Sequence, residues 1–527
     1  MKTDRIDKQR YDVIIIGSGI GGLTAGALLA RAGKSVLLLE QHDRPGGYAH
    51  GFKRKRYQFD SGVHLTSGCG LHGYRGGQVI RKVLQAVDCY QDMEFIAVDP
   101  FCHAVYPGLT ISLPQSIDAY VAALAEHFPD QEQGLRGLIA LCVEISEQAA
   151  KADDMLGGSD SGQVREQLST LFQYRRATLA DVWGEFIQDE RLRSIFATNW
   201  PYVGLPPEKV SFLYWATMFA GYLVDGAYYC KGGFQQFANT LAQAITRNGG
   251  VTAYKCPVRQ IVIEAGSVAG VRLEDGRRIT AGSVVANADM RQTVYRLVGE
   301  QHFPRRFISK LSRMSHSASI FAVYIATDLD LQALNVAQES FYYQDYDHEK
   351  NFAAVQEGEF TWLSVTAPTL VDPGLAPPGR HIIMLTTLLS YDCVDSWQES
   401  KPVFVQKMLD LAARYIPGLK DHLLLVDAGS PATMQRYTLN SHGAAYGWDA
   451  SPEQVGANRI GNRAPIAGLY FAGHWSSPGG GVYGASVSGM QAAQEILGIR
   501  EQRCFWHVVN QGCAAGAVDL DDRLAGC

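Results

Sequence analysis

The first forty residues combine two apolar runs with a helical pattern between them. The run at 13–16 ends in the glycine-rich stretch GSGIGG at 17–22, a helical pattern continues to residue 32, and a second apolar run covers 35–39. This order of strand, tight turn, helix and strand is typical of the first βαβ unit of a dinucleotide-binding fold. The pattern therefore predicts an α/β chain that opens with a Rossmann-type nucleotide-binding domain.

Three glycines of the turn have separate roles in that prediction. Gly17 allows the tight turn, Gly19 lets the backbone approach a pyrophosphate, and Gly22 lets the helix lie close to the strand. The helix then begins with free N–H groups and a positive dipole end that face the phosphates. Glu40 follows the second strand, where its carboxylate can bind a ribose diol and disfavours a 2′-phosphate. A βαβ unit without a nucleotide is the alternative, and the coincidence of these features argues against it.

Between residues 78 and 230 the apolar spacing is mostly helical. Ser116 precedes one helix, and Thr178, three residues before Asp181, resembles a capping box. The most apolar stretch, FLYWATMFAGYLV at 212–224, is too short to cross a membrane. We expect it to form a buried helix, and the alternatives are an aromatic wall of a lipid-substrate tunnel or a face that dips into a bilayer.

The rest of the chain alternates strands and helices. Strands are predicted at 258–264, 270–273, 278–286, 319–326, 360–366, 381–389 and 469–472, and helices at 234–247 and 402–415. A glycine-rich loop after residue 473 leads to a further helix that begins near 482–485. After residue 503 the periodicity is poor, so the tail is expected to be loosely ordered or to dock on a partner.

Composition narrows the class of protein. With 527 residues the chain is expected to form two or three domains, and 46% apolar with 19% charged residues is an ordinary globular composition. A net charge of −6 gives no reason to expect a nucleic-acid partner. The ten cysteines show neither a C-x-x-C pair nor a zinc spacing, so reduced thiols in a cytoplasmic protein are expected and no metal site. The charged start MKTDRIDKQR does not resemble a secretory signal.

One basic run interrupts this picture. Residues 53–56, KRKR, fall inside a predicted polar hairpin. Charged exposed strands are common, so a solvated hairpin is expected. Peripheral contact with anionic lipid headgroups is the alternative.

Several motifs together carry a family resemblance. After the G-x-G-x-x-G turn and Glu40 the chain has R-x-G-G at 44–47 and D-x-G at 60–62, and near its end GLYFAG at 468–473 is followed by PGGG. This combination resembles the FAD-dependent amine oxidase and phytoene desaturase superfamily. The resemblance implies a Rossmann-type FAD-binding domain of the GR2-like class with an inserted α+β substrate domain. FAD-binding segments are then expected at 11–77, 229–299 and 456–500, substrate-domain segments at 78–228 and 300–455, and a tail at 501–527.

The resemblance also implies which residues hold FAD. In the family the R-x-G-G backbone lies along the pyrophosphate and ribityl chain, D-x-G lies near the isoalloxazine, and the last glycine-rich loop and helix face the reduced flavin. The residues implied are Gly17, Gly19, Ile20, Gly21, Gly22, Glu40, Gln41, Arg44, Gly46, Gly47, Ser61, Gly62, Val258, Gly473, His474, Gly481 and Val482. Many members have an acidic residue in place of His474, so its hydrogen bond to the ribityl chain is an open question.

Within the superfamily, the stretch SPATMQRYTLNSHGAAY at 430–446 resembles the carotenoid desaturase, carotenoid isomerase and retinol saturase branch. This implies a hydrophobic polyene substrate, related to carotenoids or retinoids, and desaturation, saturation or cis–trans isomerisation at C–C bonds. No second dinucleotide fingerprint is present, so a quinone or oxygen is the expected electron acceptor. His64, just after the D-x-G turn, is the predicted catalytic acid or base, and a buried structural histidine is the alternative. Tyr446 and His442 are weaker candidates.

Two other functions use the same scaffold. An amine or amino-acid oxidase often has a lysine near the flavin, and the stretch 468–496 contains none. A GDP-dissociation-inhibitor-like protein binds prenylated GTPases without flavin chemistry, and the intact Gly17-x-Gly19-x-x-Gly22 turn with Glu40 argues against it.

Overall fold

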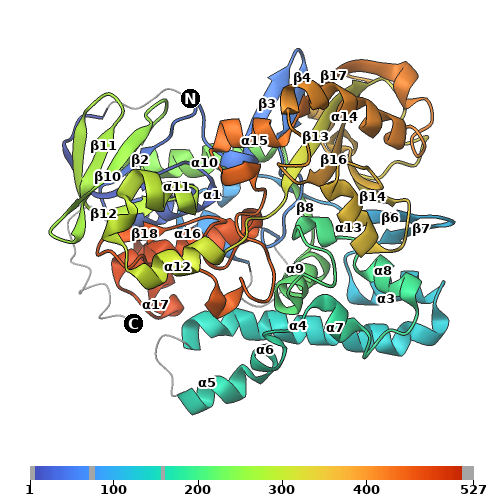
Figure 1. The fold of residues 1–527 in the computed structure, drawn as a ribbon, viewed down its shortest axis with the longest axis horizontal. Coiled ribbons are helices and arrows are strands. Elements are labelled where there is room, and N and C mark those ends of the chain that lie inside the picture. The colour runs from blue at the N-terminus through green and yellow to red at the C-terminus, as the bar shows by residue number, and fades with distance from the viewer. Residues whose placement is uncertain (1–5, 71–77, 156–160, 513–527) are drawn as a thin grey trace.

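Three separate stretches of the chain build one sheet. The structure is a computed structural model that describes residues 6–70, 78–155 and 161–512, and Figure 1 shows this sheet on the left. Its order is β10-β11-β12-β1-β2-β9, and β18 pairs in parallel with the carboxyl end of β12. The strands are β1 (Arg10–Ile16), β2 (Val36–Leu39), β9 (Val251–Ala253), β10 (Val258–Glu264), β11 (Ser267–Leu273), β12 (Arg278–Ala286) and β18 (Leu469–Phe471). The parallel core of β12, β1, β2 and β9 confirms the Rossmann-type α/β prediction.

Three helices from the same stretches cover this sheet. The helix α1 (Ile20–Arg31) packs against α10 (Phe234–Arg247) and α16 (Gly481–Leu497). Small residues let the helices approach closely, since a Cβ on Gly489 would lie 2.3 Å from the carbonyl oxygen of Gly21. Almost all of α1 is therefore buried, and the cofactor-binding segments expected from sequence are held together by helix packing as well as by strand pairing.

A second, mainly antiparallel sheet lies on the upper right in Figure 1. Its order is β17-β13-β16-β15-β14-β6-β7, in which only the β14–β6 pair is parallel. The strands are β6 (Cys102–Tyr106), β7 (Leu109–Leu113), β13 (Ser319–Thr327), β14 (Glu339–Tyr343), β15 (Trp362–Thr366), β16 (His381–Leu389) and β17 (Leu423–Gly429). All of these strands belong to 78–228 and 300–455, the segments where the α+β substrate domain is predicted.

The mostly helical prediction for 78–230 missed four short strands. The β6–β7 hairpin joins the second sheet, and β5 (Phe95–Ala97) pairs with β8 (Tyr228–Cys230). Strands this short are stabilised by distant partners, here β14 in the case of β6, so local periodicity could not reveal them. The described part of the segment is otherwise helical, and the predicted caps Ser116 and Thr178 each accept a hydrogen bond at their helix start.

The remaining helices surround the two sheets. Helix α9 (Phe212–Val224) coincides with the apolar stretch and packs on α4, burying Phe212, Trp215 and Phe219. Within 6–70, 78–155 and 161–512 no helix combines the length and apolar character needed to span a bilayer. The others are α2 (Val79–Ala86), α3 (Ile117–Ala125), α4 (Glu132–Met155), α5 (Ser161–Gln167), α6 (Ser169–Tyr174), α7 (Leu179–Trp183), α8 (Glu190–Phe196), α11 (Met290–Gln292), α12 (Arg305–Arg313), α13 (His348–Gln356) and α15 (Pro431–Thr438).

Two helix boundaries differ from the prediction. The helix expected at 402–415 is α14 (Trp397–Ala412), which begins earlier because Ser396 caps it, and Pro402 lies inside it. The tail, expected to be loosely ordered, forms α17 (Gln502–Gln511), which buries Phe505, Val508 and Val509 against the body of the protein. Residues 513–527 lie outside the described part of the chain.

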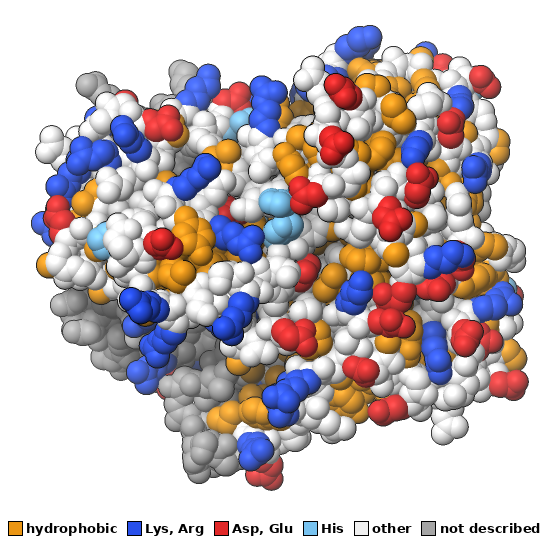
Figure 2. Space-filling view, viewed as in Figure 1, with side chains coloured by type: hydrophobic (Ala, Val, Ile, Leu, Met, Phe, Trp, Pro, Cys, Tyr) orange, Lys and Arg blue, Asp and Glu red, His pale blue; other side chains and the backbone are white. Residues whose placement is uncertain are grey.

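The basic run sits where the sequence placed it, at a polar hairpin. The strands β3 (Gly51–Arg54) and β4 (Tyr57–Asp60) pair, and residues 53–56 are exposed. Arg54 forms an ion pair of 2.6 Å with Asp427. On the face shown in Figure 2, Lys and Arg side chains are interspersed with Asp and Glu.

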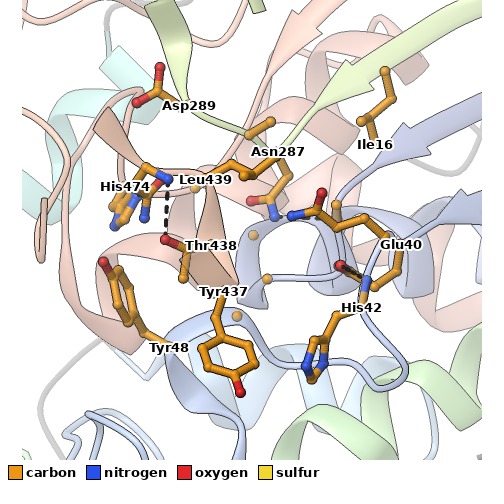
Figure 3. A pocket seen from close by; sticks show the side chains of 18 of the residues that line it. Ile16, Glu40, His42, Tyr48, Asn287, Asp289, Tyr437, Thr438, Leu439 and His474 are labelled. Carbon is orange, nitrogen blue, oxygen red and sulfur yellow. Dashed lines mark hydrogen bonds between the residues drawn. The ribbon is translucent and has the colours of Figure 1, made fainter. Parts of the chain in front are cut away.

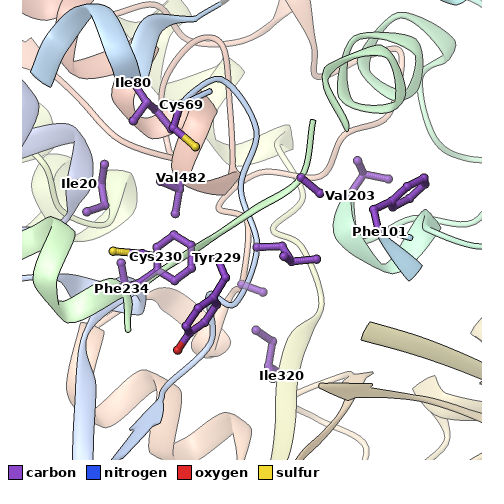
Figure 4. Close-up of a cluster of buried hydrophobic side chains, with 14 of the residues drawn as sticks. Ile20, Cys69, Ile80, Phe101, Val203, Tyr229, Cys230, Phe234, Ile320 and Val482 are labelled. Atoms are coloured by element: carbon purple, nitrogen blue, oxygen red, sulfur yellow. The ribbon is translucent and has the colours of Figure 1, made fainter. Parts of the chain in front are cut away.

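One hydrophobic interior runs from the first sheet to the second. Figure 4 shows Ile20 and Val482 near Phe234 and Tyr229, with Ile320 of the second sheet close by, and all of these are at most 8% exposed. The eight cysteines in the described part of the chain are free thiols.

Candidate functional site

A cavity of about 450 Å³ lies at the carboxyl ends of the parallel strands. Ile16 and Leu39, the last residues of β1 and β2, line it, and Figure 3 shows Ile16, Glu40 and Asn287 around it. In open α/β sheets ligands bind in this crevice. The cavity is therefore where a dinucleotide is expected.

The cavity brings together most of the residues that the sequence predicted. Those that line it are Gly17, Gly19, Ile20, Gly21, Glu40, Gln41, Arg44, Gly46, Gly47, Gly62, Val258, Gly473, His474, Gly481 and Val482. Gly22 and Ser61 are not among the lining residues. A Cβ on Gly22 would lie 2.3 Å from the carbonyl oxygen of Gly17, so its role is the close approach of helix to strand. The Ser61 hydroxyl donates to the carbonyl of Tyr48 at 3.0 Å.

The glycine-rich turn leaves no room for side chains. Gly17 has a φ of +91°, which favours glycine, and a Cβ on Gly21 would lie 2.5 Å from the backbone nitrogen of Gly473. The R-x-G-G segment contacts this turn, since the N–H of Gly46 donates to the carbonyl of Ser18 at 2.9 Å. The bare backbone and the start of α1 together form a cradle for a diphosphate.

Glu40 is fixed at the rim of this cradle. Its carboxylate accepts hydrogen bonds from the backbone N–H and hydroxyl of Ser18, at 2.7 and 2.6 Å, and from the backbone N–H of His42 at 2.8 Å. The side chain is only 9% exposed and lines the cavity. A carboxylate oriented in this way has remaining acceptor positions for a ribose diol.

Glu40→Ala is expected to lower FAD affinity by roughly 10- to 100-fold, or about 1.4–2.8 kcal/mol, since it removes charged hydrogen bonds to the ribose and loosens the turn. Titration of the apoprotein with FAD, followed by flavin fluorescence, measures this. Glu264→Ala is the control, because Glu264 is exposed and pairs with Arg278 on the surface. Equal affinities of the two variants would contradict a ribose-binding role.

The Arg44 side chain is held by contacts within the protein. Its guanidinium forms an ion pair with Asp43 at 2.9 Å and donates to the carbonyl of Gly51 at 3.3 Å. It lines the cavity, so it contributes positive charge near the cradle. In this arrangement the part of the R-x-G-G segment that can contact the cofactor is mainly its glycine backbone.

A helix start lies at the opposite end of the cavity. Helix α16 begins at Gly481 with no side-chain cap, and Gly481 and Val482 line the cavity, so the positive end of the helix dipole faces it. Burial, together with the Arg459 charge, lowers the pKa of His474 to about 3, so the imidazole is neutral. His474 Nε2 lies 3.4 Å from Asn440 Oδ1. This environment favours the negative charge of a reduced flavin.

Sequence reasoning missed several lining residues. Asn287 donates to the carbonyl of Gly17 at 3.3 Å, and its side chain lies beside Gly19 and Gly473. It follows β12, so the rule that sites form at the carboxyl ends of parallel strands could have found it. His42, Tyr48, Asp289 and residues 437–440 also line the cavity (Figure 3). Residues 437–440 are distant in sequence from the glycine-rich turn at 17–22, and no local sequence pattern indicates that they reach the cavity.

The predicted catalytic residues are divided between the cavity and its surroundings. His64 is not a lining residue, and its Nε2 forms an ion pair with Glu339 at 3.3 Å. Tyr446 lines the cavity and donates to the carbonyl of Pro201 at 2.8 Å. His442 lies elsewhere, 3.2 Å from the carboxylate of Asp392. The aromatic residues Trp200, Phe212, Trp215 and Phe219 are at most 3% exposed and belong to the core.

The described residues fit FAD. A glycine cradle with a helix start suits the diphosphate, Glu40 suits the ribose, and the start of α16 suits the redox-active ring. When bound, FAD exchanges hydride with the substrate.

Comparison with known proteins agrees with this fit. Among proteins of known name, prolycopene isomerase 1 of an Oncidium hybrid cultivar is 28% identical over 94% of this chain and 86% of its own. All-trans-retinol 13,14-reductase of Danio rerio is 25% identical over 88% and 82%, and the lycopene-forming phytoene desaturase of Pseudescherichia vulneris is 26% identical over 92% and 98%.

Solved structures share the fold. Putrescine oxidase bound to putrescine superposes with a TM-score of 0.62 at 16% identity, covering 93% of this chain and 99% of its own. An oxidoreductase from Methanosarcina mazei gives 0.60 at 19% identity, covering 92% and 100%. The family model described as flavin containing amine oxidoreductase matches residues 20–497. The chain therefore belongs to the flavin-containing amine oxidoreductase family and is an FAD-dependent oxidoreductase.

Proposed function

We propose that this flavoenzyme acts on C–C bonds of a hydrophobic polyene, carotenoid-like or retinoid-like, by desaturation, saturation or cis–trans isomerisation. The similarity to the prolycopene isomerase, retinol reductase and phytoene desaturase over at least 88% of the chain supports this. An amine or amino-acid oxidase is the second candidate, supported by a solved putrescine oxidase of 16% identity, which is a likeness of fold. The non-catalytic GDP-dissociation-inhibitor-like function is disfavoured by the intact cofactor cradle.

The chain's residues have distinct tasks in the proposed reaction. The glycine cradle and Glu40 orient the cofactor, and the start of α16 stabilises negative charge on it. Apolar walls that exclude water receive the polyene. The polar residues around His64 handle the proton of the reaction. A quinone or oxygen takes up electrons from the reduced enzyme when the reaction is oxidative. The basic hairpin at 53–56 contacts anionic lipid headgroups.

Anaerobic stopped-flow spectroscopy tests this function. The oxidised enzyme is mixed with carotenoids or retinoids in detergent micelles and, separately, with amines, and products are analysed by mass. Flavin bleaching by polyenes, or a product with two hydrogens more or fewer, or an isomer of equal mass, supports the proposal. Bleaching by amines alone would replace it with the oxidase function.

A further inference from the structure

A buried ion pair lies directly behind the cavity wall. Gly62 and Val63 line the cavity, and the next residue, His64, places its Nε2 3.3 Å from Oε2 of Glu339 on β14. The Glu339 side chain is fully buried and that of His64 is 12% exposed. Removing two charges from water is costly unless they are paired and hydrogen-bonded, so such a pair marks a functional candidate.

The two oxygens of Glu339 are in different situations. Oε2 receives both the ion pair from His64 and a hydrogen bond of 2.8 Å from the hydroxyl of Thr366. Oε1 has no hydrogen-bond partner among the described residues, and neither has the buried hydroxyl of Tyr202. Buried polar atoms in proteins are normally satisfied. Oε1 is therefore a buried, oriented acceptor without a hydrogen-bond partner among the described residues.

Aromatic side chains surround this unpartnered oxygen. The Tyr202 ring lies 6.3 Å from that of His64 and 5.4 Å from each of the Tyr222 and Phe341 rings, and the Tyr222 ring stacks with Phe101 at 6.3 Å. Figure 4 shows Phe101 beside Val203 in the hydrophobic interior. Flat apolar rings suit a conjugated hydrocarbon and not a polar ligand.

The contacts of His64 favour its protonated form. Burial lowers the pKa of His64, but the Glu339 charge, the hydrogen bond to it, the Asp60 charge and a hydrogen bond to the Gly62 backbone raise it, and the net direction is upward. The Asp60 carboxylate is bound by other groups, since it accepts hydrogen bonds from the Tyr229 hydroxyl and the Phe234 N–H, both at 2.8 Å. The imidazole therefore orients the Glu339 side chain through its contact with Oε2.

We propose that Glu339 is the proton acceptor of the polyene reaction, acting through Oε1, and that His64 is the residue that positions it. This inference rests on the proposed function. In the oxidative direction, one substrate C–H bond gives its hydrogen and electron pair to FAD. Glu339 Oε1 takes the proton from the adjacent carbon, whose C–H electron pair forms the new C=C bond. The two electrons leave through the quinone or oxygen, and the reverse proton transfer from Glu339 serves saturation.

The first test compares Glu339→Gln with the wild type in anaerobic flavin reduction by a polyene. Because a general base contributes typically 10²–10⁴-fold, the reduction rate is expected to fall by at least about a hundredfold. Flavin content and affinity are expected to be unchanged, since Glu339 is not a lining residue of the cofactor cavity. Ser340→Ala, a neutral change at the next buried position of β14, is the control and keeps the wild-type rate. A Glu339→Gln rate within threefold of the wild type overturns the inference.

His64→Asn provides a second test that does not depend on Glu339→Gln folding. Without the imidazole beside Glu339, the rising limb of the rate–pH profile is expected to move to higher pH, with the rate largely recovered above that limb. A merely structural histidine would lower the rate at all pH values. A catalytic His64 would abolish it at all pH values, and either result overturns the assignment.

A third readout needs no substrate. In the holoenzyme with ¹³C-labelled histidine, the His64 resonance is assigned by its loss in His64→Asn. It is expected to titrate at higher pH in the wild type than in Glu339→Gln, and identical titrations would refute the coupling.

If the wild type itself is not reduced by any polyene, the proposed function fails. If it is reduced and Glu339→Gln is reduced as fast, only the inference fails.

Discussion

Gly19→Asp is expected to give folded protein that is almost free of flavin. A Cβ at this position would lie 2.8 Å from Nδ2 of Asn287, at the bottom of the cradle. The added carboxylate would also place a negative charge where the diphosphate binds at the start of α1. The steric and electrostatic effects act in the same direction, so a loss of at least about 3 kcal/mol, roughly a hundredfold or more in FAD affinity, is expected. Flavin absorbance per polypeptide and FAD titration of the apoprotein measure it.

Gly461→Asp is the matched control. Gly461 is exposed, has no positive φ, and a Cβ there would meet nothing within 4 Å. The control adds the same charge to the same chain and is expected to retain flavin. If Gly19→Asp kept full flavin occupancy, the turn at 17–22 would not be the diphosphate site.

Arg459→Met is expected to destabilise the holoenzyme by about 3 kcal/mol, because charged hydrogen bonds to buried carbonyls are lost. Arg459 is 4% exposed and donates to the carbonyls of His474, Ser476 and Gln454 at 2.7, 3.1 and 3.3 Å. It therefore holds the loop between β18 and α16 in place. Urea titration followed by flavin release and by circular dichroism measures the effect, and flavin is expected to be released before the rest of the protein unfolds.

Arg463→Met is the control that distinguishes loss of the loop contacts of Arg459 from loss of a positive charge in general. Arg463 is exposed and pairs with Glu495 on the surface at 2.6 Å. Exposed ion pairs contribute about 0–1 kcal/mol, so this variant is expected to behave as the wild type. Equal effects of the two substitutions would show that the loop does not depend on the buried guanidinium.

Predictions from sequence succeeded where the signal is local. The boundaries of α9 and α10 and the capping of α3 and α7 follow from apolar spacing and from Ser116 and Thr178. Most of the predicted cofactor residues line one cavity, because most of them belong to turns and helix starts that follow the carboxyl end of a strand. Such turns are short, and their glycines are required by the backbone geometry of the turn itself.

Predictions failed or stayed incomplete where distant contacts decide. The strands β6 and β7 exist because β14, more than 200 residues away, pairs with β6. Helix α17 forms where periodicity is poor, since the body of the protein buries Phe505, Val508 and Val509. In the same way, no local pattern indicates that residues 437–440 reach the cofactor cavity.

The sequence by itself determined that this protein has an α/β cofactor fold and predicted which turns hold the diphosphate and ribose, because these depend on short-range periodicity and on glycine geometry. Only the tertiary structure decided the surroundings of His64. The fold places Glu339 against the imidazole, although the two residues are 275 positions apart in the sequence. It leaves one buried carboxylate oxygen without a hydrogen-bond partner among the described residues, close to aromatic rings. Burial and charge pairing are properties of the folded interior, and they are what give this carboxylate its proposed role.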